Sequence, residues 1–215
     1  MSDQRPAVPM TVDQLVLRVA ALAAAPRVLV GITGEPGAGK STCAARLRDG
    51  LADRGIGAAL VGMDGFHIAH RALGELGLVE VKGAPETFDA GGYLALLHRL
   101  RARENGVVWA PEFRREIEDS IASAIPVGPE VRVVITEGNY LLLDGPWRGV
   151  RSVLDEVWFL EVSTEVRHRR LAARHEQFGR SAAQAWERTL GSDERNARTI
   201  SETRHRADLV VCLSG

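Results

Sequence analysis

This sequence has few cysteines, no long apolar run and almost no excess of either charge. Its 215 residues include two cysteines, Cys43 and Cys212, each in an apolar segment and without the spacing of metal ligands. So few cysteines argue against a disulfide framework and indicate a reduced, cytoplasmic protein. No apolar run reaches the roughly 18 residues of a membrane span. The N-terminus also lacks the basic start and apolar stretch of a signal peptide, so we expect neither a membrane span nor export.

The charge balance argues against a further class of function. Lys and Arg total 27 and Asp and Glu total 28, which gives a formal net charge of −1. Proteins that bind nucleic acid through their surface need a basic excess, so we expect no nucleic-acid partner. With 215 residues, of which 45% are hydrophobic and 26% charged, the chain has the composition of a single globular domain with an adequate core.

One stretch carries a recognisable motif. Val28 to Ile32 predicts a buried strand, a glycine-rich segment follows, and residues 40–54 predict a helix. Strand, G-x-x-x-x-G-K-S and helix together form a P-loop, whose backbone N–H groups and helix N-terminus suit a polyphosphate. Lys40 would reach the β- and γ-phosphates and Ser41 Oγ would bind Mg²⁺. A plain glycine-rich turn is the alternative. The predicted nucleotide-binding residues are Gly34, Glu35, Pro36, Gly37, Ala38, Gly39, Lys40, Ser41 and Thr42.

Strands alternate with helices along the rest of the chain. Further apolar strand-like segments occur at 58–63, 131–136, 156–162 and 208–212, with helical spacing between them. This alternation predicts an α/β fold: a three-layer P-loop NTPase sandwich with a five-stranded, mainly parallel sheet and helices on both faces. Residues 1–10, which contain two prolines, should form a loose arm. The extended stretch 107–114 could form a pairing edge between two copies in a homodimer.

Two acidic residues follow strands directly. Asp64 comes after the strand at 58–63 and Glu137 after the strand at 131–136. The carboxyl ends of parallel strands meet at one edge of the sheet, so both should lie near the P-loop. Asp64 would then face the γ-phosphate, and Glu137 would hold Mg²⁺ or its waters. The alternatives are a helix cap for Asp64 and a strand-end cap for Glu137.

A dense basic cluster occupies the predicted helix at 164–178. Arg170 and Arg174 are spaced i and i+4 and share one face. Such a run is commonly a solvated face. It could equally be a lid whose guanidinium groups bind the transferring phosphoryl group, because their planar fork matches phosphate oxygens. We predict the lid, over about residues 164–181.

Several polar residues are candidates to contact a substrate. His67 follows Asp64 closely, and a histidine there either touches substrate or is hydrogen-bonded structure. The other candidates are Lys82, Arg114 with its neighbour Arg115, and Tyr140 beyond Glu137.

A family resemblance rests on motifs that occur in a characteristic order. They are Gly-Glu-Pro-Gly-Ala-Gly-Lys-Ser at 34–41, Met-Asp-Gly-Phe-His at 63–67, Lys-Gly-Ala-Pro-Glu-Thr-Phe-Asp at 82–89, Ala-Pro-Glu-Phe at 110–113 and Glu-Gly-Asn-Tyr-Leu-Leu at 137–142. With these motifs the chain resembles the phosphoribulokinase/uridine kinase family of P-loop kinases, and most of all its bacterial-pantothenate-kinase-like branch, which includes fructose-transport-associated kinases.

The resemblance implies ATP-dependent phosphorylation of a small-molecule hydroxyl group. It implies Asp64 as the base, Glu137 as a second acidic residue, and the Arg170/Arg174 stretch as the lid. It also implies that the adenine lies near Asn196 and the region 204–208. Bacterial pantothenate kinases have more chain in the substrate-binding part, so the resemblance does not specify pantothenate.

Together these features predict a single kinase domain over residues 1–215. It would have an N-terminal arm and helix at 1–26, a substrate-binding insert at about 65–128, and the lid. ATP and Mg²⁺ are the expected cofactors, and the partner is a small-molecule alcohol: a sugar such as fructose, a nucleoside or a pantothenate-like alcohol. A regulatory GTPase is disfavoured because the sequence lacks an Asn/Thr-Lys-x-Asp motif, and an ABC-type ATPase because it lacks Leu-Ser-Gly-Gly-Gln. A nucleotide-dependent regulatory or binding module without kinase activity is the remaining alternative.

Overall fold

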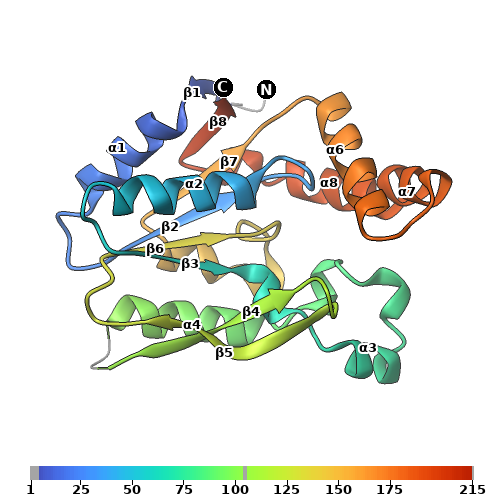
Figure 1. Cartoon of the computed structure of the whole chain (residues 1–215), viewed down its shortest axis with the longest axis horizontal. Helices are drawn as coiled ribbons and strands as arrows, with labels where there is room; N and C mark the ends of the chain where they lie inside the picture. The colour runs from blue at the N-terminus through green and yellow to red at the C-terminus, as the bar shows by residue number, and fades with distance from the viewer. Residues whose placement is uncertain (1–4, 104–105, 215) are drawn as a thin grey trace.

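The computed structural model describes residues 5–103 and 106–214, which form a parallel sheet between two layers of helices (Figure 1). The sheet has six strands in the order β1-β8-β7-β2-β6-β3, and every neighbouring pair is parallel. The strands are β1 (Val8–Met10), β2 (Val28–Thr33), β3 (Ala58–Gly62), β6 (Val133–Glu137), β7 (Glu156–Leu160) and β8 (Leu209–Leu213). The predicted α/β fold with a mainly parallel sheet is confirmed.

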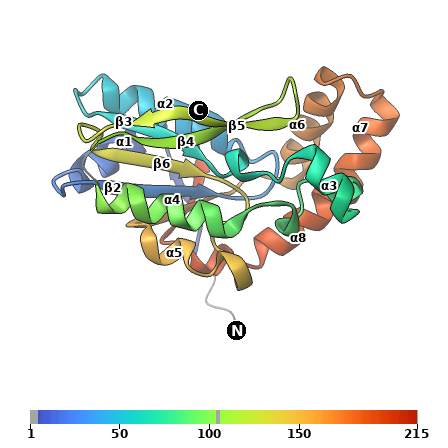
Figure 2. The same ribbon diagram turned by 90° about the horizontal axis from the view of Figure 1, so that it is seen from below.

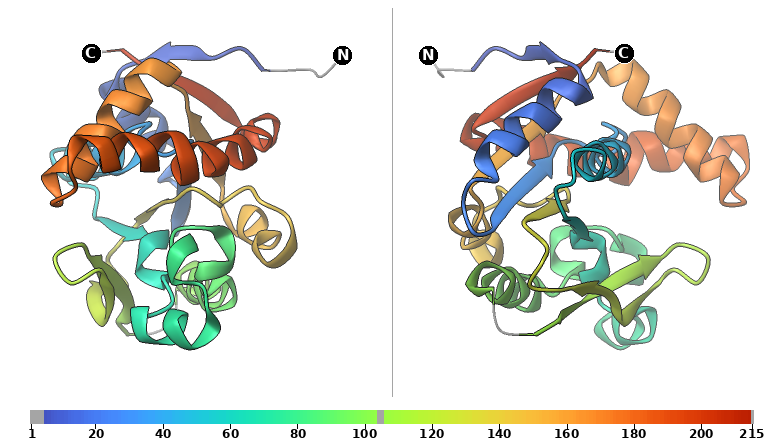
Figure 3. Two further views of the ribbon diagram at one scale, coloured as in Figure 1. Left: turned by 90° about the vertical axis from the view of Figure 1, so that its right-hand side faces the viewer. Right: turned by 60° about the vertical axis from the view of Figure 1, so that its left-hand side comes forward.

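The prediction of five strands was wrong by one. Residues expected to form a loose arm contribute β1, which runs beside β8 with Val8 opposite Val211 and Met10 opposite Leu213 (Figure 3). Three residues carry no periodicity that could reveal a strand. Backbone hydrogen bonding to β8, almost the whole chain away, makes this segment extended.

Helices cover both faces of the sheet (Figure 2). On one face, α1 (Val12–Leu22) and α2 (Lys40–Ala52) bury residues such as Leu15, Val19 and Leu47 against β2 and β6. On the other, α4 (Ala90–Ala102) and α5 (Val150–Val153) bury Tyr93, Leu97 and further apolar residues. No helix within 5–103 and 106–214 is long and apolar enough to cross a membrane.

Two groups of elements extend beyond the carboxyl end of the sheet. One consists of α6 (Thr164–Gln177), α7 (Ala182–Arg188), a π-helical turn (Thr189–Asp193) and α8 (Glu194–Ser201). The other contains the turn Met63–Phe66, α3 (His70–Leu76) and the antiparallel hairpin of β4 (Val108–Arg114) and β5 (Asp119–Val127). The hairpin runs beside β3, and its tip lies at the end of the sheet where α6, α7 and α8 gather (Figure 1). The stretch predicted as an edge between two copies thus pairs with β5 of its own chain.

Candidate active site

The P-loop connects β2 to α2 in the backbone conformation that its glycines permit. Gly34 has φ +146°, and a Cβ there would lie 2.5 Å from the carbonyl oxygen of Leu160, so no other residue fits without a shift. Lys40 opens α2 and folds back over the loop, where Nζ donates to the carbonyls of Gly34 (2.8 Å) and Glu35 (3.1 Å). Burial lowers the pKa of Lys40 to about 8. The ammonium group is thus held where phosphate oxygens would replace the two carbonyls.

Two oxygen ligands suited to Mg²⁺ lie next to Lys40. Ser41 Oγ donates to Glu137 Oε1 at 3.0 Å, and Glu137 ends β6 between β2 and β3. Burial, followed by the nearby charge of Asp64, raises the pKa of Glu137. A divalent cation would offset this cost. Within the described residues, no group of three or more His, Cys, Asp or Glu side chains is arranged to hold a metal ion.

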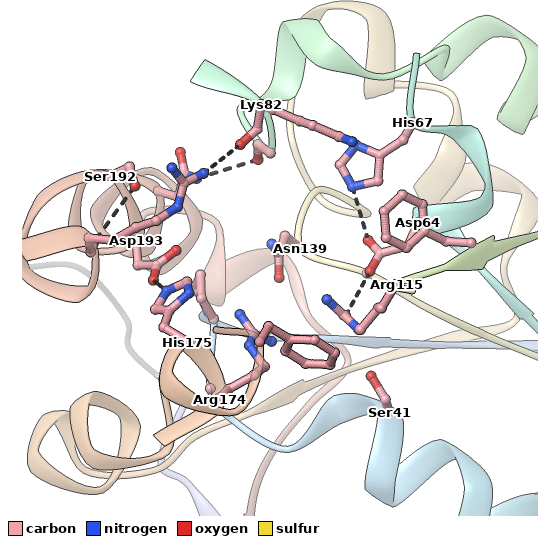
Figure 4. A pocket seen from close by; sticks show the side chains of 18 of the residues that line it. Ser41, Asp64, His67, Lys82, Arg115, Asn139, Arg174, His175, Ser192 and Asp193 are labelled. Atoms are coloured by element: carbon pink, nitrogen blue, oxygen red, sulfur yellow. Dashed lines mark hydrogen bonds and ion pairs between the residues drawn. The ribbon is translucent and has the colours of Figure 1, made fainter. Parts of the chain in front are cut away.

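Asp64 lies across the cavity from α6, next to the side chains of Arg115 and His67 (Figure 4). Its Oδ2 lies 3.4 Å from Arg115 Nη2, and its Oδ1 lies 4.0 Å from His67 Nε2. His67 is packed between Phe88 and Phe113, with ring centroids 4.0 and 4.8 Å away. Burial lowers the pKa of His67 to about 4, so the imidazole is neutral near pH 7. The carboxylate therefore faces a fixed guanidinium and a neutral ring.

The basic helix α6 divides its arginines among three environments. Arg167 is buried and bridges Glu35 of the P-loop (2.5 Å) and Glu194 of α8 (3.0 Å). Arg170 is exposed, with Nη1 only 3.5 Å from the carbonyl of Gly37. Arg174 lines the cavity, burial lowers its pKa, and its guanidinium group has no hydrogen bond or ion pair within the described part of the chain. One helix thus presents arginines to the P-loop, to the cavity and to solvent, and the lid at 164–181 stays a prediction.

Most of the predicted site residues meet in one cavity of about 200 Å³, and Asn139, Asp193 and Arg188 line it too. A second cavity of about 400 Å³ lies beside the P-loop. The predicted residues that line it are Ala38, Gly39, Thr42 and Arg170, and its other walls include Cys43, Val162, Leu213 and Ser214. The predicted residues in the first cavity are Pro36, Gly37, Lys40, Ser41, Asp64, His67, Lys82, Glu137, Arg174 and Asn196.

Two predicted substrate residues do not line the first cavity. Arg114 lies on the outer face of the hairpin and binds Glu112 at 2.6 Å. Tyr140 is buried, its hydroxyl donates to the carbonyl of Gly83 at 2.5 Å, and burial raises its pKa. It supports the loop at 82–83 from behind.

Arg115 was a candidate alongside Arg114 in the sequence, and the structure separates the two. Arg114 is the last residue of β4, whereas Arg115 begins the turn of the hairpin and lines the cavity.

The region predicted to lie near adenine is divided between two cavities. Asn196 Nδ2 donates to the carbonyl of Gly83 at 3.4 Å and lines the cavity that contains Asp64. Arg204 binds Glu161 at 2.5 Å and lines a separate cavity with Glu35 and Arg167.

Two comparisons with known proteins both match proteins named as kinases. A protein of Schizosaccharomyces pombe, named as a candidate uridine kinase, is 34% identical over 195 residues, which cover 86% of this chain and 83% of that protein. The crystal structure of a candidate fructose transport system kinase from Silicibacter sp. TM1040 has 41% identity and a TM-score of 0.85, covering 94% of this chain and 98% of that one.

Two further comparisons concern the fold and the P-loop segment. YFH7 of Saccharomyces cerevisiae, a candidate P-loop kinase with a circular permutation, has the same fold, with 20% identity, a TM-score of 0.80, and coverage of 96% of this chain and 100% of that one. The family model of the methylmalonyl Co-A mutase-associated GTPase MeaB matches residues 2–69, which contain the P-loop.

Proposed function

Because this chain belongs to the P-loop kinases of the uridine kinase and phosphoribulokinase family, we propose that it transfers the γ-phosphoryl group of ATP to a hydroxyl group of a small molecule. One observation carries the proposal. The carboxylate of Asp64 opens into the same cavity as Lys40 and Ser41 of the P-loop. A proton acceptor next to a phosphate-binding loop is the arrangement that transfer to an alcohol requires.

The residues suggest a division of roles. Lys40 would leave the carbonyls of Gly34 and Glu35 and donate to the β- and γ-phosphates. Ser41 and Glu137 would hold Mg²⁺, which supplies charge neutralisation on the phosphates. Asp64 would accept or orient the proton of the acceptor hydroxyl, with Arg115 keeping its carboxylate in place. Arg174 would meet the charge that develops on the phosphoryl group.

The second cavity is suited to the base of the nucleotide. It adjoins Gly39 and Thr42 at the start of α2, so it is reached from the phosphate site without crossing the cavity of Asp64. Its walls include apolar side chains such as Val162 and Leu213, which fit a flat aromatic ring. In this arrangement ATP and acceptor approach the P-loop from different sides.

Asp64→Asn tests the proposal. The substitution keeps the size of the side chain and removes its basicity, so acceptor phosphorylation should fall about 10²–10⁴-fold. ATP binding, measured by calorimetry on the same protein, should change little. As a control, acceptor phosphorylation and nucleotide binding are both measured again with GTP in place of ATP. If ATP binds but no alcohol in a panel of sugars, nucleosides and vitamin precursors is phosphorylated, the protein is a nucleotide-dependent binding module. If nucleotide binding itself is lost in Asp64→Asn, the base must be sought elsewhere.

A further inference from the structure

We propose that the acceptor alcohol carries an anionic group, a carboxylate or a phosphate, which Arg188 binds at the end of the cavity away from Asp64, with Lys82 contributing a second positive charge from the wall between the two ends. This rests on the proposed function and names the class of its acceptor. The starting observation is that two guanidinium groups line the cavity without an ion-pair or side-chain partner among the described residues. They are Arg174, beside the P-loop, and Arg188, at the end of α7.

The other cationic side chains on the walls outside the P-loop are paired within the protein. Arg115 binds Asp64 at 3.4 Å, and the ammonium of Lys82 donates to the carbonyl of Glu118. Arg180 donates to His175 Nδ1 at 3.1 Å, which directs the Nε2–H of His175 toward Asp193 at 2.7 Å. By contrast, the side chain of Arg188 makes one hydrogen bond among residues 5–103 and 106–214, in which Nη2 donates to the carbonyl of Lys82 at 3.3 Å.

An unmatched guanidinium in a cavity is suited to a ligand anion. Its planar fork donates to two oxygens of a carboxylate or phosphate, and it stays charged at any physiological pH. The γ-phosphate accounts for Arg174, which shares a cavity wall with Gly37, Lys40 and Ser41 of the P-loop. Arg188 is absent from that wall. A second anion, on the acceptor, accounts for it.

The position of Arg188 matches the far end of an acceptor whose hydroxyl lies at Asp64. Ser192 and Asp193, which follow α7, lie across the cavity from Asp64 and Ser41 (Figure 4). Further donors gather at this end: Asn196 Nδ2 lies 3.4 Å from the carbonyl of Gly83, next to the carbonyl that Arg188 contacts. Asp193, at the same end, accepts a hydrogen bond from His175 Nε2 at 2.7 Å.

Lys82 supplies a second cation on the wall between the two ends. Its Nζ lies 5.5 Å from the centre of the Phe113 ring, which also faces Arg115. The carboxylate of its neighbour Glu118 is 3.7 Å away and 62% exposed, so that group can turn to solvent when a ligand anion arrives. The cavity that these groups line has a volume of about 200 Å³.

The test compares alcohols that differ only in the anion. Suitable pairs are glycerol and glycerate, fructose and fructose 6-phosphate, and panthenol and pantothenate. Acceptor-dependent ADP release gives kcat and KM, and mass spectrometry identifies the product. We expect the anionic member of the productive pair to have a kcat/KM at least about tenfold higher, since hydrogen bonds to charged groups contribute on that order.

Arg188→Gln should erase this preference by raising KM for the anionic acceptor about 10- to 100-fold while leaving the binding of Mg·ATP unchanged. Arg188→Lys should recover part of the loss because it restores the charge without the fork. Arg195→Gln, on an exposed position of α8 outside the cavity, is the matched control and should behave as wild type.

Three outcomes would overturn the inference. The first is a neutral alcohol that is phosphorylated as well as the anionic alcohol of the same pair. This outcome would leave the proposed kinase function standing. The second is an unchanged KM for the anion in Arg188→Gln. The third is a protein saturated with a non-hydrolysable ATP analogue and Mg²⁺ that binds none of the anionic alcohols in calorimetry. Failure of the ATP analogue itself to bind would instead refute the proposed function.

Discussion

Arg115→Ala, compared with Arg114→Ala, separates a positioning role in the site from a general role of the hairpin. Both arginines form partly exposed ion pairs: Arg115 with Asp64 at 3.4 Å, with side chains 40% and 35% exposed, and Arg114 with Glu112 at 2.6 Å, with side chains 57% and 42% exposed. Exposed pairs of this kind contribute about 0–1 kcal/mol to stability. The two substitutions should therefore change the free energy of unfolding by similar, small amounts.

Their effects on the reaction should differ. Removing Arg115 frees the carboxylate of Asp64, and a misplacement of about 1 Å in a reacting group costs on the order of 10²-fold in rate. We expect kcat to fall about 10- to 100-fold, which is roughly 1.4–2.7 kcal/mol of barrier and exceeds the stability term. Arg114→Ala should retain wild-type kcat because its side chain faces solvent.

The assay is steady-state acceptor phosphorylation at saturating ATP, with urea unfolding of each variant in parallel. Arg115→Lys should recover part of the lost kcat, because a cation remains near Asp64 without the guanidinium geometry. KM for ATP should stay unchanged in all three variants. Equal kcat values for Arg115→Ala and Arg114→Ala, or a loss of kcat that tracks the loss of stability, would refute the reasoning.

Three further predictions concern the P-loop and α6. Burial lowers the pKa of Lys40 to about 8, so ATP affinity measured by calorimetry should decrease as the pH rises through 8. The free energy of unfolding without nucleotide should instead increase from about pH 8 to 10.5, because Lys40 keeps its proton to higher pH in the unfolded state than in the folded one. Lys40→Met should remove both dependences, and an affinity that is flat from pH 7 to 9.5 would contradict the assignment. Arg167→Met should lower the free energy of unfolding by about 3 kcal/mol in urea titrations, because the two carboxylates that Arg167 bridges lose their cation, whereas exposed Arg169→Met should change it by less than about 0.5 kcal/mol. Arg174→Ala should lower kcat about 10²–10³-fold with little change in ATP binding, and a variant that loses only stability would assign Arg174 to packing.

Much of the nucleotide end of the site was predictable because its information is local. Strand, glycine-rich loop and helix are contiguous over residues 28–52, and the glycines mark the loop conformation directly. Asp64 and Glu137 were also predictable, because parallel strands place their carboxyl ends at one edge whatever their order in the sheet. The Ser41–Glu137 hydrogen bond of 3.0 Å joins residues that are 96 positions apart.

The acceptor end was predictable only in outline. The sequence motifs identified the segments 63–67, 82–89 and 110–113, and all three reach the cavity. Which side chain of each segment faces inward depends on the twist and register of the β4–β5 hairpin, which shifts between Ala110 and Glu112. A period of two tells two faces of a strand apart but does not say which one is buried, so Arg114 and Arg115 could not be distinguished.

By itself, the sequence determined the fold class, the phosphate-binding loop and the two acidic strand ends, because each of these follows from periodicity or from contiguous residues. Only the tertiary structure decided that residues 8–10 form a sixth strand, that Arg167 anchors α6 to the P-loop, and that Arg188 faces the cavity without a carboxylate. These features depend on contacts between residues far apart in the chain. Such contacts are selected by the packing of the whole domain, and no local pattern records them.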